Sequence, residues 1–105
     1  MIEALQIVTA TATKADAEKI ARGLVERRLA ACVQIAGPIT SCYRWEGKIE
    51  TAEEWVCTIK TRRDLYPQVE TAIKELHPYQ TPEILATDVV EGSREYLQWL
   101  SDETA

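Results

Sequence analysis

The chain has 105 residues, of which 46% are hydrophobic and 28% charged, a composition typical of a single globular domain over residues 1–105. Its net charge of −5 would repel a phosphate backbone, and its apolar runs are too short for a signal peptide or a membrane span, so we expect neither a nucleic-acid nor a membrane partner. Without a signal peptide or a membrane span, a cytoplasmic location is expected. Three cysteines without paired spacing are expected to be reduced thiols.

The N-terminal part of the chain predicts a strand followed by an amphipathic helix. Residues 3–10 combine apolar and β-branched side chains, as a short strand does. Thr13 and Asp16 then have the spacing of a capping box, and the helix that they begin is expected to end near Arg28. The apolar face of this helix recurs at helical spacing and comprises Ile20, Ala21, Leu24 and Val25.

The next segment is apolar from residue 29 to residue 35 except at Gln34, which predicts a strand buried on both faces. Gly37 and Pro38 interrupt this pattern. Cys32 lies within the run, and we interpret it as a small core side chain rather than a nucleophile, because apolar burial raises the pKa of a thiol. The segment is therefore expected to serve the core.

A long hairpin is predicted next, with strands over residues 39–49 and 54–62. Gly47 indicates a bulge, and residues 50–53 are expected to form the turn. The hairpin presents three large aromatic residues, Tyr43, Trp45 and Trp55. Because Trp and Tyr are favoured in the buried centres of interfaces, we expect self-association through this surface.

The C-terminal part predicts a second helix, a fourth strand and a short terminal helix. Asp64 has the position of an N-cap, and Pro67 falls in the first helical turn, where its missing amide is harmless. This helix is expected to end at His77, because a proline follows. Residues 84–90 are expected to form a strand, and Gly92 and Ser93 start a short helix.

The resulting order is β-α-β-β-α-β plus a terminal helix. It predicts an α+β, ferredoxin-like fold in which a four-stranded antiparallel sheet carries both main helices on one face. No glycine-rich phosphate loop, HExxH or GxSxG pattern occurs, and no nucleophile with a base and an orienting group can be assembled. We therefore expect that the protein is not an enzyme.

The segment from His77 to Glu83 is the main candidate for a site, because it joins the only histidine to a carboxylate between two prolines. His77 has two interpretations. It either bonds the last carbonyls of its helix, or acts with Glu83 as a ligand for a divalent cation such as copper or zinc. A stable site needs about four donors, so water, a thiolate or another subunit would have to complete it.

Acidic residues also gather near the predicted hairpin tip, at positions 46, 50, 53 and 54. They either attract cations or form an ordinary solvated surface. Glu53 and Lys60 either pair within the subunit or line a cleft between subunits. The sequence leaves these alternatives open.

Several motifs together resemble the CutA family of divalent-cation tolerance proteins across nearly the whole chain. They are Leu29-Ala30-Ala31-Cys32, Ser41, Tyr43, Trp45, Gly47, Lys48, Glu53, Glu54, Lys60, Thr61, His77-Pro78-Tyr79, Pro82-Glu83, Tyr96, Leu97 and Trp99. The resemblance implies a homotrimer of ferredoxin-like subunits that is similar to the PII signalling proteins, binds Cu(II) and contributes to metal tolerance.

The resemblance also bears on the metal ligands. Copper ligation in the family has been attributed to a thiol near the end of the first strand, a histidine beside the His-Pro-Tyr motif and the glutamate after its second proline. Here the first two positions hold Thr9 and Leu76, so only His77 and Glu83 remain. We therefore expect weak binding of Cu(II) or another divalent cation.

An alternative function follows from the resemblance to PII proteins. In it, the trimer is a signalling or adaptor module that binds a small anionic ligand in the clefts between subunits. Lys60, Arg44 and Tyr79 are then the candidate contacts.

Overall fold

The computed structural model describes residues 3–105 and has the α+β element order that the sequence predicts. Residues 1 and 2 of the predicted domain lie outside this range. The elements are β1 (Ala4–Thr11), α1 (Lys14–Glu26), β2 (Cys32–Trp45), β3 (Lys48–Arg62), the 3-10 turn η1 (Arg63–Leu65), α2 (Tyr66–Leu76), β4 (Leu85–Val89) and α3 (Arg94–Asp102).

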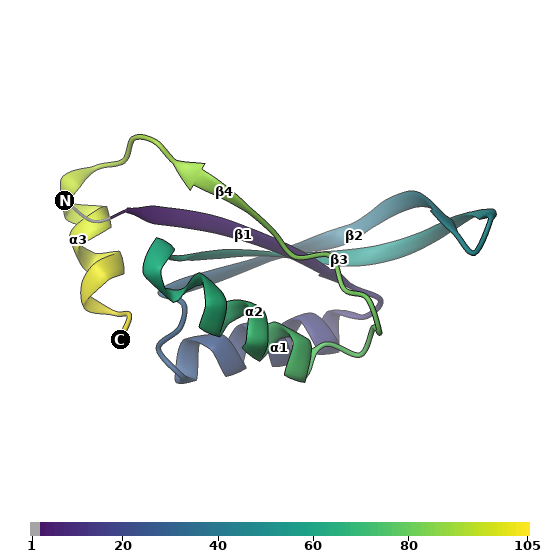
Figure 1. Ribbon diagram of the computed structural model, residues 1–105, viewed down its shortest axis with the longest axis horizontal. Helices are drawn as coiled ribbons and strands as arrows, with labels where there is room; N and C mark the ends of the chain where they lie inside the picture. The colour runs from purple at the N-terminus through teal and green to yellow at the C-terminus, as the bar shows by residue number, and fades with distance from the viewer. Residues whose placement is uncertain (1–2) are drawn as a thin grey trace.

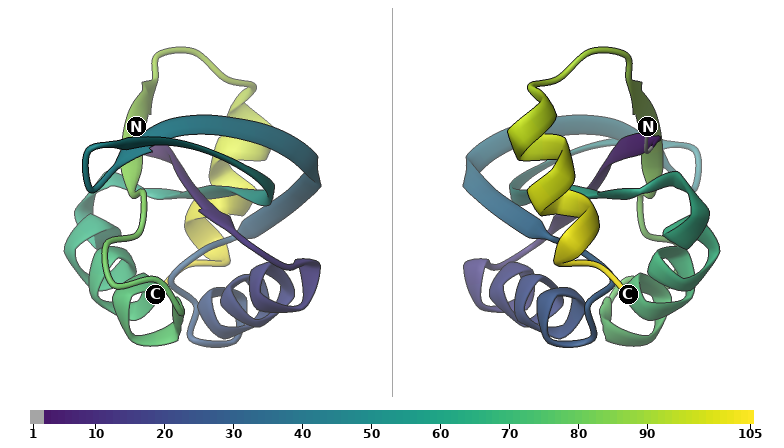
Figure 2. Two further views of the ribbon diagram at one scale, coloured as in Figure 1. Left: turned by 90° about the vertical axis from the view of Figure 1, so that its right-hand side faces the viewer. Right: turned by 90° about the vertical axis from the view of Figure 1, so that its left-hand side faces the viewer.

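The four strands form one sheet in the order β2-β3-β1-β4, and all neighbouring strands are antiparallel. Helices α1 and α2 lie side by side on one face of this sheet, as predicted (Figures 1 and 2). The core fills the space between them and the two central strands. Its largest fully buried side chains include Ile7, Ile20, Leu24, Ile59, Val69 and Ile73.

The start of α1 confirms the predicted cap. The Thr13 hydroxyl oxygen accepts a hydrogen bond from the Asp16 amide at 3.1 Å, which satisfies one of the free amides of the first turn. The helix ends at Glu26, slightly earlier than expected, because Arg28 has a left-handed φ of 59°. The inward face was wrong at one position, since Val25 is 44% exposed.

Strand β2 differs from the prediction of a strand buried on both faces. It begins at Cys32 rather than Leu29, and it lies at the edge of the sheet with most of its side chains half-buried or exposed. It continues past Gly37 and Pro38 through a bulge between Ala36 and Ile39. An apolar run indicates burial but does not say which strand is central, and this explains the error.

The hairpin turn lies at Glu46 and Gly47, so the prediction of a turn at residues 50–53 was wrong. Both residues have positive φ, 49° and 78°, and Trp45 pairs directly with Lys48. Two-residue hairpin turns require this backbone conformation, which glycine adopts without strain. Gly47 thus forms the turn itself, and β3 begins immediately after it.

The prediction that Asp64 caps α2 was also wrong. Leu65 occupies the N-cap position without a side-chain bond, and Asp64 instead accepts from the Arg62 guanidinium at 2.9 Å. The 3-10 turn before α2 moves the start of the helix beyond the reach of Asp64. The C-terminal end of α2 lies where the sequence predicts it, because His77 is the C-cap of this helix.

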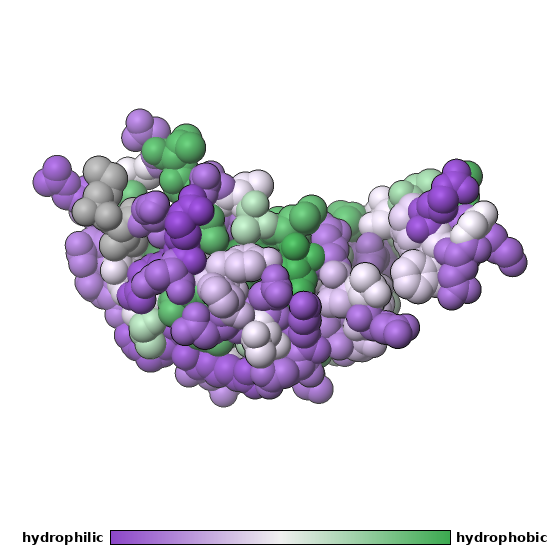
Figure 3. Space-filling view, viewed as in Figure 1, coloured by the Kyte–Doolittle hydropathy of each residue, from purple (hydrophilic) through white to green (hydrophobic). Residues whose placement is uncertain are grey.

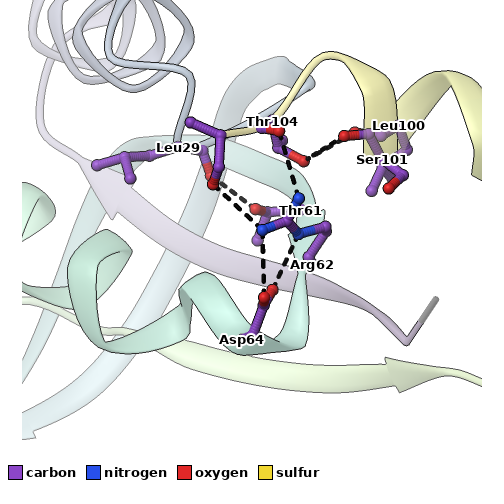
Figure 4. A network of polar contacts seen from close by, with 8 residues as sticks. Leu29, Thr61, Arg62, Asp64, Leu100, Ser101 and Thr104 are labelled. Carbon is purple, nitrogen blue, oxygen red and sulfur yellow. Dashed lines mark hydrogen bonds and ion pairs between the residues drawn. The ribbon is translucent and has the colours of Figure 1, made fainter.

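The C-terminal segment is attached to the end of β3 by a polar network (Figure 4). Thr61 donates to the Leu29 carbonyl at 2.6 Å, and Arg62 donates to the Thr104 carbonyl at 3.3 Å. The Thr104 hydroxyl in turn donates to the Leu100 carbonyl at 3.0 Å. Helix α3 is thereby held at the end of the sheet that lies away from the hairpin (Figure 1).

The molecule is elongated, with extents of 45 × 25 × 22 Å, because the hairpin of β2 and β3 projects beyond the helices (Figure 1). Its surface is hollowed where the hairpin leaves the helix-covered body (Figure 3). No helix within residues 3–105 combines the length and the apolar character needed to cross a membrane.

Candidate functional site

His77 is buried between β1 and the segment that follows α2, with 7% of its surface exposed. Its Nε2 atom lies 2.8 Å from the Ala10 carbonyl oxygen, and the Tyr79 amide donates to its Nδ1 atom at 3.1 Å. A carbonyl only accepts and an amide only donates, so the proton must be on Nε2. The ring is therefore a neutral imidazole that joins α2 to β1.

This geometry bears on both interpretations of His77. The residue does end α2, but its ring bonds a carbonyl of β1 rather than the last carbonyls of its own helix. As a metal ligand it would have to use Nδ1 and displace the Tyr79 amide. Glu83 is exposed on the same connecting segment.

The other positions of the proposed ligand set supply no metal donor. Thr9 is fully buried and its hydroxyl has no partner, while Leu76 packs against the hydrophobic core. Within residues 3–105, no three His, Cys, Asp or Glu side chains are grouped so that they could hold a metal ion. The described residues of one subunit thus do not by themselves supply the donors for a tight site.

Tyr79 connects the His77 segment to the hairpin. Its ring lies 4.7 Å from the His77 ring, and its hydroxyl donates to Oε2 of Glu54 at 3.0 Å. Burial, followed by the Glu54 hydrogen bond and negative charge, raises the pKa of Tyr79 to about 12. The phenol therefore stays protonated and keeps donating to Glu54 at physiological pH.

Tyr79 and Glu54 border a cavity of about 570 Å³ between the hairpin and the segment that follows α2. We call it the hairpin cavity. Its wall includes Ser41, Tyr43, Trp45, Glu54, Tyr79 and Glu83. Among its described lining residues none is lysine, arginine or histidine. Sequence analysis found Glu83 and Tyr79 but did not connect them to Glu54, because the contact spans 25 residues.

The cationic residues considered for an anionic ligand lie elsewhere. The Lys60 ammonium lies 5.8 Å from the centre of the Tyr96 ring of α3, and neither Lys60 nor Arg44 lines the hairpin cavity. The ion pairs found within residues 3–105 do not include Glu53 with Lys60. Within one subunit, Lys60 and Arg44 therefore supply no positive charge to the hairpin cavity that Tyr79 lines.

The aromatic residues of the hairpin do not share one surface. Trp55 packs against the hydrophobic core, and the Lys14 ammonium of α1 lies 5.9 Å from its ring. Tyr43 and Trp45 are 44% and 46% exposed. The expectation of a three-residue aromatic patch was thus wrong for Trp55, which alternation places on the helix-covered face with Cys57.

The cysteines are unpaired, as predicted, but Cys32 is only half-buried. Cys57 is the fully buried thiol, and burial raises its pKa to about 11. Cys42 is exposed and lines the hairpin cavity. The core role expected of Cys32 therefore belongs mainly to Cys57.

Known proteins with similar sequence and structure agree with this fold. Residues 5–103 match the family described as CutA1 divalent ion tolerance protein. The divalent-cation tolerance protein CutA of Thermus thermophilus is 47% identical over 88 residues, which cover 84% of this chain and 85% of that protein. Neither name denotes an enzyme.

Two eukaryotic proteins extend the similarity. Human Protein CutA is 44% identical over 88 residues, which cover 84% of this chain and 49% of the human protein. This chain therefore aligns with about half of the human protein. The crystal structure of CutA1 from Oryza sativa has a TM-score of 0.96 at 33% sequence identity, with 99% of this chain and 95% of that chain covered.

Proposed function

Because the chain belongs to the CutA1 divalent ion tolerance protein family, we propose that it is a cytoplasmic homotrimer that binds copper weakly and acts in the response to divalent metal ions. The observation that carries this proposal is the family match over residues 5–103. We propose no catalytic role, in keeping with the names of the family and the bacterial relative.

The strand order and the exposed hairpin support the assembly. The order β2-β3-β1-β4, with α1 and α2 on one face, fits a ferredoxin-like subunit. Tyr43, Trp45 and Ile49 are exposed on the projecting hairpin, and a second subunit would cover them. Light scattering should give three times the chain mass of 11.9 kDa. A monomer at micromolar concentration would contradict the assembly.

For the metal, we propose His77 and Glu83 as ligands, with water or a second subunit completing the set. His77 would bind through Nδ1, because its Nε2 proton is held by the Ala10 carbonyl. Binding would cost the hydrogen bond from the Tyr79 amide, about 0.5–1.5 kcal/mol, so the expected affinity is low. Imidazole and carboxylate both suit Cu(II).

Copper titration followed by pulsed electron paramagnetic resonance tests this proposal. The chain has one histidine, so a signal from a remote imidazole nitrogen identifies His77 without any mutation. We expect that signal together with a rise in hydrogen exchange at the Tyr79 amide. Cu(II) bound without the imidazole signal would remove His77 from the site.

Three variants sharpen the test. Glu83→Gln should weaken Cu(II) binding, whereas Glu91→Gln removes another exposed carboxylate, located after β4, and should leave it unchanged. Thr9→Cys places a thiol where the family resemblance has one and should strengthen binding of Cu(I) more than of Cu(II). Equal effects of the two glutamate variants would indicate a general charge effect rather than ligation.

A further inference from the structure

We propose that the hydrogen bond from the Tyr79 hydroxyl to the Glu54 carboxylate fixes the direction of the projecting hairpin, and so prepares it to receive a second copy of this chain. We call this contact the Tyr79–Glu54 link. The inference rests on the proposed trimer and deepens it, because it names the contact that readies each subunit for assembly. Tyr79 is thus a positioning residue that acts through the hairpin.

The projecting part of the hairpin is a ribbon of two strands. β1 pairs with β3 only as far as Trp55, which lies opposite Thr11, so residues 48–54 pair with β2 alone. At the same level β2 has its bulge, between Ala36 and Ile39, and bulges bend a strand and increase its twist. A two-stranded ribbon is only marginally stable by itself and twists more strongly than a wider sheet. Strand pairing therefore fixes its direction only weakly.

The Tyr79–Glu54 link is the side-chain contact that ties this ribbon to the body. Among the side-chain hydrogen bonds and ion pairs found within residues 3–105, it alone joins residues 39–54 to the rest of the chain. Both of its residues line the hairpin cavity, so the link crosses the space between ribbon and body. Its acceptor is a carboxylate, which makes it stronger than a bond between neutral groups.

Tyr79 is itself held in place from the body. Its amide donates to Nδ1 of His77 at 3.1 Å, and its ring lies 4.7 Å from the His77 ring. His77 is buried, and its Nε2 atom bonds the Ala10 carbonyl of β1, a central strand of the sheet. A continuous series of contacts therefore runs from the middle of the sheet to the ribbon.

The direction of the ribbon matters because the surface that it carries belongs to the proposed interface. Tyr43, Trp45 and Ile49 are exposed on the ribbon, and the second subunit would cover them. A ribbon that already points in the required direction loses less conformational freedom on association than a mobile one, and the difference appears mainly as slower dissociation. In a ring of three identical subunits the link is used three times, so its effect multiplies.

Subunit exchange tests the proposal. Unlabelled and isotope-labelled protein are mixed with EDTA, so that no metal competes for His77, and native mass spectrometry follows the mixed trimers at a temperature where the wild type exchanges measurably. Tyr79→Phe keeps the ring and loses the hydroxyl. It should exchange at least about tenfold faster, because a hydrogen bond is lost at every hairpin. A rate equal to that of the wild type would overturn the proposal.

Further variants separate the link from other effects. Tyr66→Phe removes a similar bond, from a phenol to the Glu70 carboxylate within α2, and should exchange like the wild type. Glu54→Ala should match Tyr79→Phe, whereas Glu54→Gln keeps an acceptor and should exchange more slowly than Glu54→Ala. The double variant of Tyr79→Phe and Glu54→Ala should exchange no faster than either alone. Additive effects would mean that the two side chains act separately, and would overturn the proposal.

Hydrogen exchange distinguishes a directing role from a general loss of stability. In Tyr79→Phe it should rise in residues 48–54 but not in residues 57–61, where β3 lies under the helices. A rise in both ranges would overturn the proposal. If light scattering shows that the wild type is a monomer, the proposed trimer fails and this inference fails with it. If the wild type is a trimer and Tyr79→Phe exchanges as slowly, the inference alone fails.

Discussion

The two halves of β3 belong to one strand but have opposite surroundings. In the half that follows Val56, Cys57, Ile59 and Thr61 are fully buried under α1 and α2. In the half that precedes Trp55, no fully buried residue occurs, and Ile49 is 69% exposed. The half after Val56 holds the subunit together, and the half before Trp55 extends beyond the helices (Figure 1).

The difference shows that the hairpin is not needed to complete the core. An apolar residue that is buried by the fold stabilises the subunit, whereas one left exposed on a projecting strand is available to a partner or a ligand. The hairpin cavity lies where the two halves meet, since Glu54 belongs to the projecting half and is bonded to Tyr79 of the body. Four experiments test this division.

The largest effect is expected from a matched pair of isoleucines. Ile59→Ala should lower the free energy of unfolding by about 2–5 kcal/mol, because it leaves a cavity in the core. Ile49→Ala should change it by less than about 0.5 kcal/mol in the isolated subunit. Urea unfolding at several protein concentrations measures both. In the proposed trimer, where a second subunit covers Ile49, the loss for Ile49→Ala should be larger and should depend on protein concentration. A loss as large as that of Ile59→Ala at every protein concentration would contradict the division of β3.

A smaller loss is expected where α3 is attached to the body. Arg62→Met keeps the apolar stem but removes the bonds to Asp64 and the Thr104 carbonyl, and should cost about 2 kcal/mol. Arg22→Met removes an exposed pair with Glu26 and should cost less than about 0.5 kcal/mol. Urea unfolding compares them, and hydrogen exchange should rise in residues 100–104 for Arg62→Met alone. Equal losses would show that the network contributes little.

Two threonines of β1 should respond in opposite directions. Thr9→Val removes a buried hydroxyl that lacks a partner, and should raise the free energy of unfolding by about 1 kcal/mol. Thr11→Val removes a hydroxyl that donates to the Thr13 carbonyl at 2.7 Å, and should lower it by about 1 kcal/mol. Thermal unfolding of both variants decides the sign. A loss of stability in Thr9→Val would mean that its hydroxyl is bonded in solution.

The smallest effect concerns the link between the two halves. The folded pKa of Tyr79, about 12, exceeds its ordinary value of 10.0, so its contribution to stability is complete below pH 10 and is lost as the pH rises to 12. Tyr79 is 36% exposed, so solvent screening keeps this loss below about 1 kcal/mol. Tyr79→Phe should show a shallower decline than wild type in urea unfolding over this range. Identical slopes would exclude Tyr79 as the source.

Sequence analysis correctly predicted the local elements whose signals lie within a few residues. The Thr13 cap, the end of α2 at His77 and the Ser93 start of α3 all depend on neighbouring backbone groups. Gly47 is a local signal for the turn as well, but a glycine within a strand pattern equally indicates a bulge, which is how the sequence analysis interprets it. The Asp64 cap failed because a 3-10 turn separates it from α2.

The site could be predicted only in part. His77 and Glu83 were found from their residue types, but the partners of the His77 ring are backbone groups, and Ala10 is 67 residues away in sequence. No side-chain pattern encodes such a contact. The same holds for Glu54 and Tyr79, whose hydrogen bond depends on how the hairpin twists against the body.

The sequence by itself determined the family, the order of the elements and the presence of a rigid segment between His77 and Glu83, because motifs and capping signals are local. Only the tertiary structure decided that β2 is an edge strand, that Trp55 turns to the core while Tyr43 and Trp45 stay exposed, and that both nitrogens of His77 are engaged. These features depend on contacts between residues far apart in the chain, which hydrophobic periodicity does not specify.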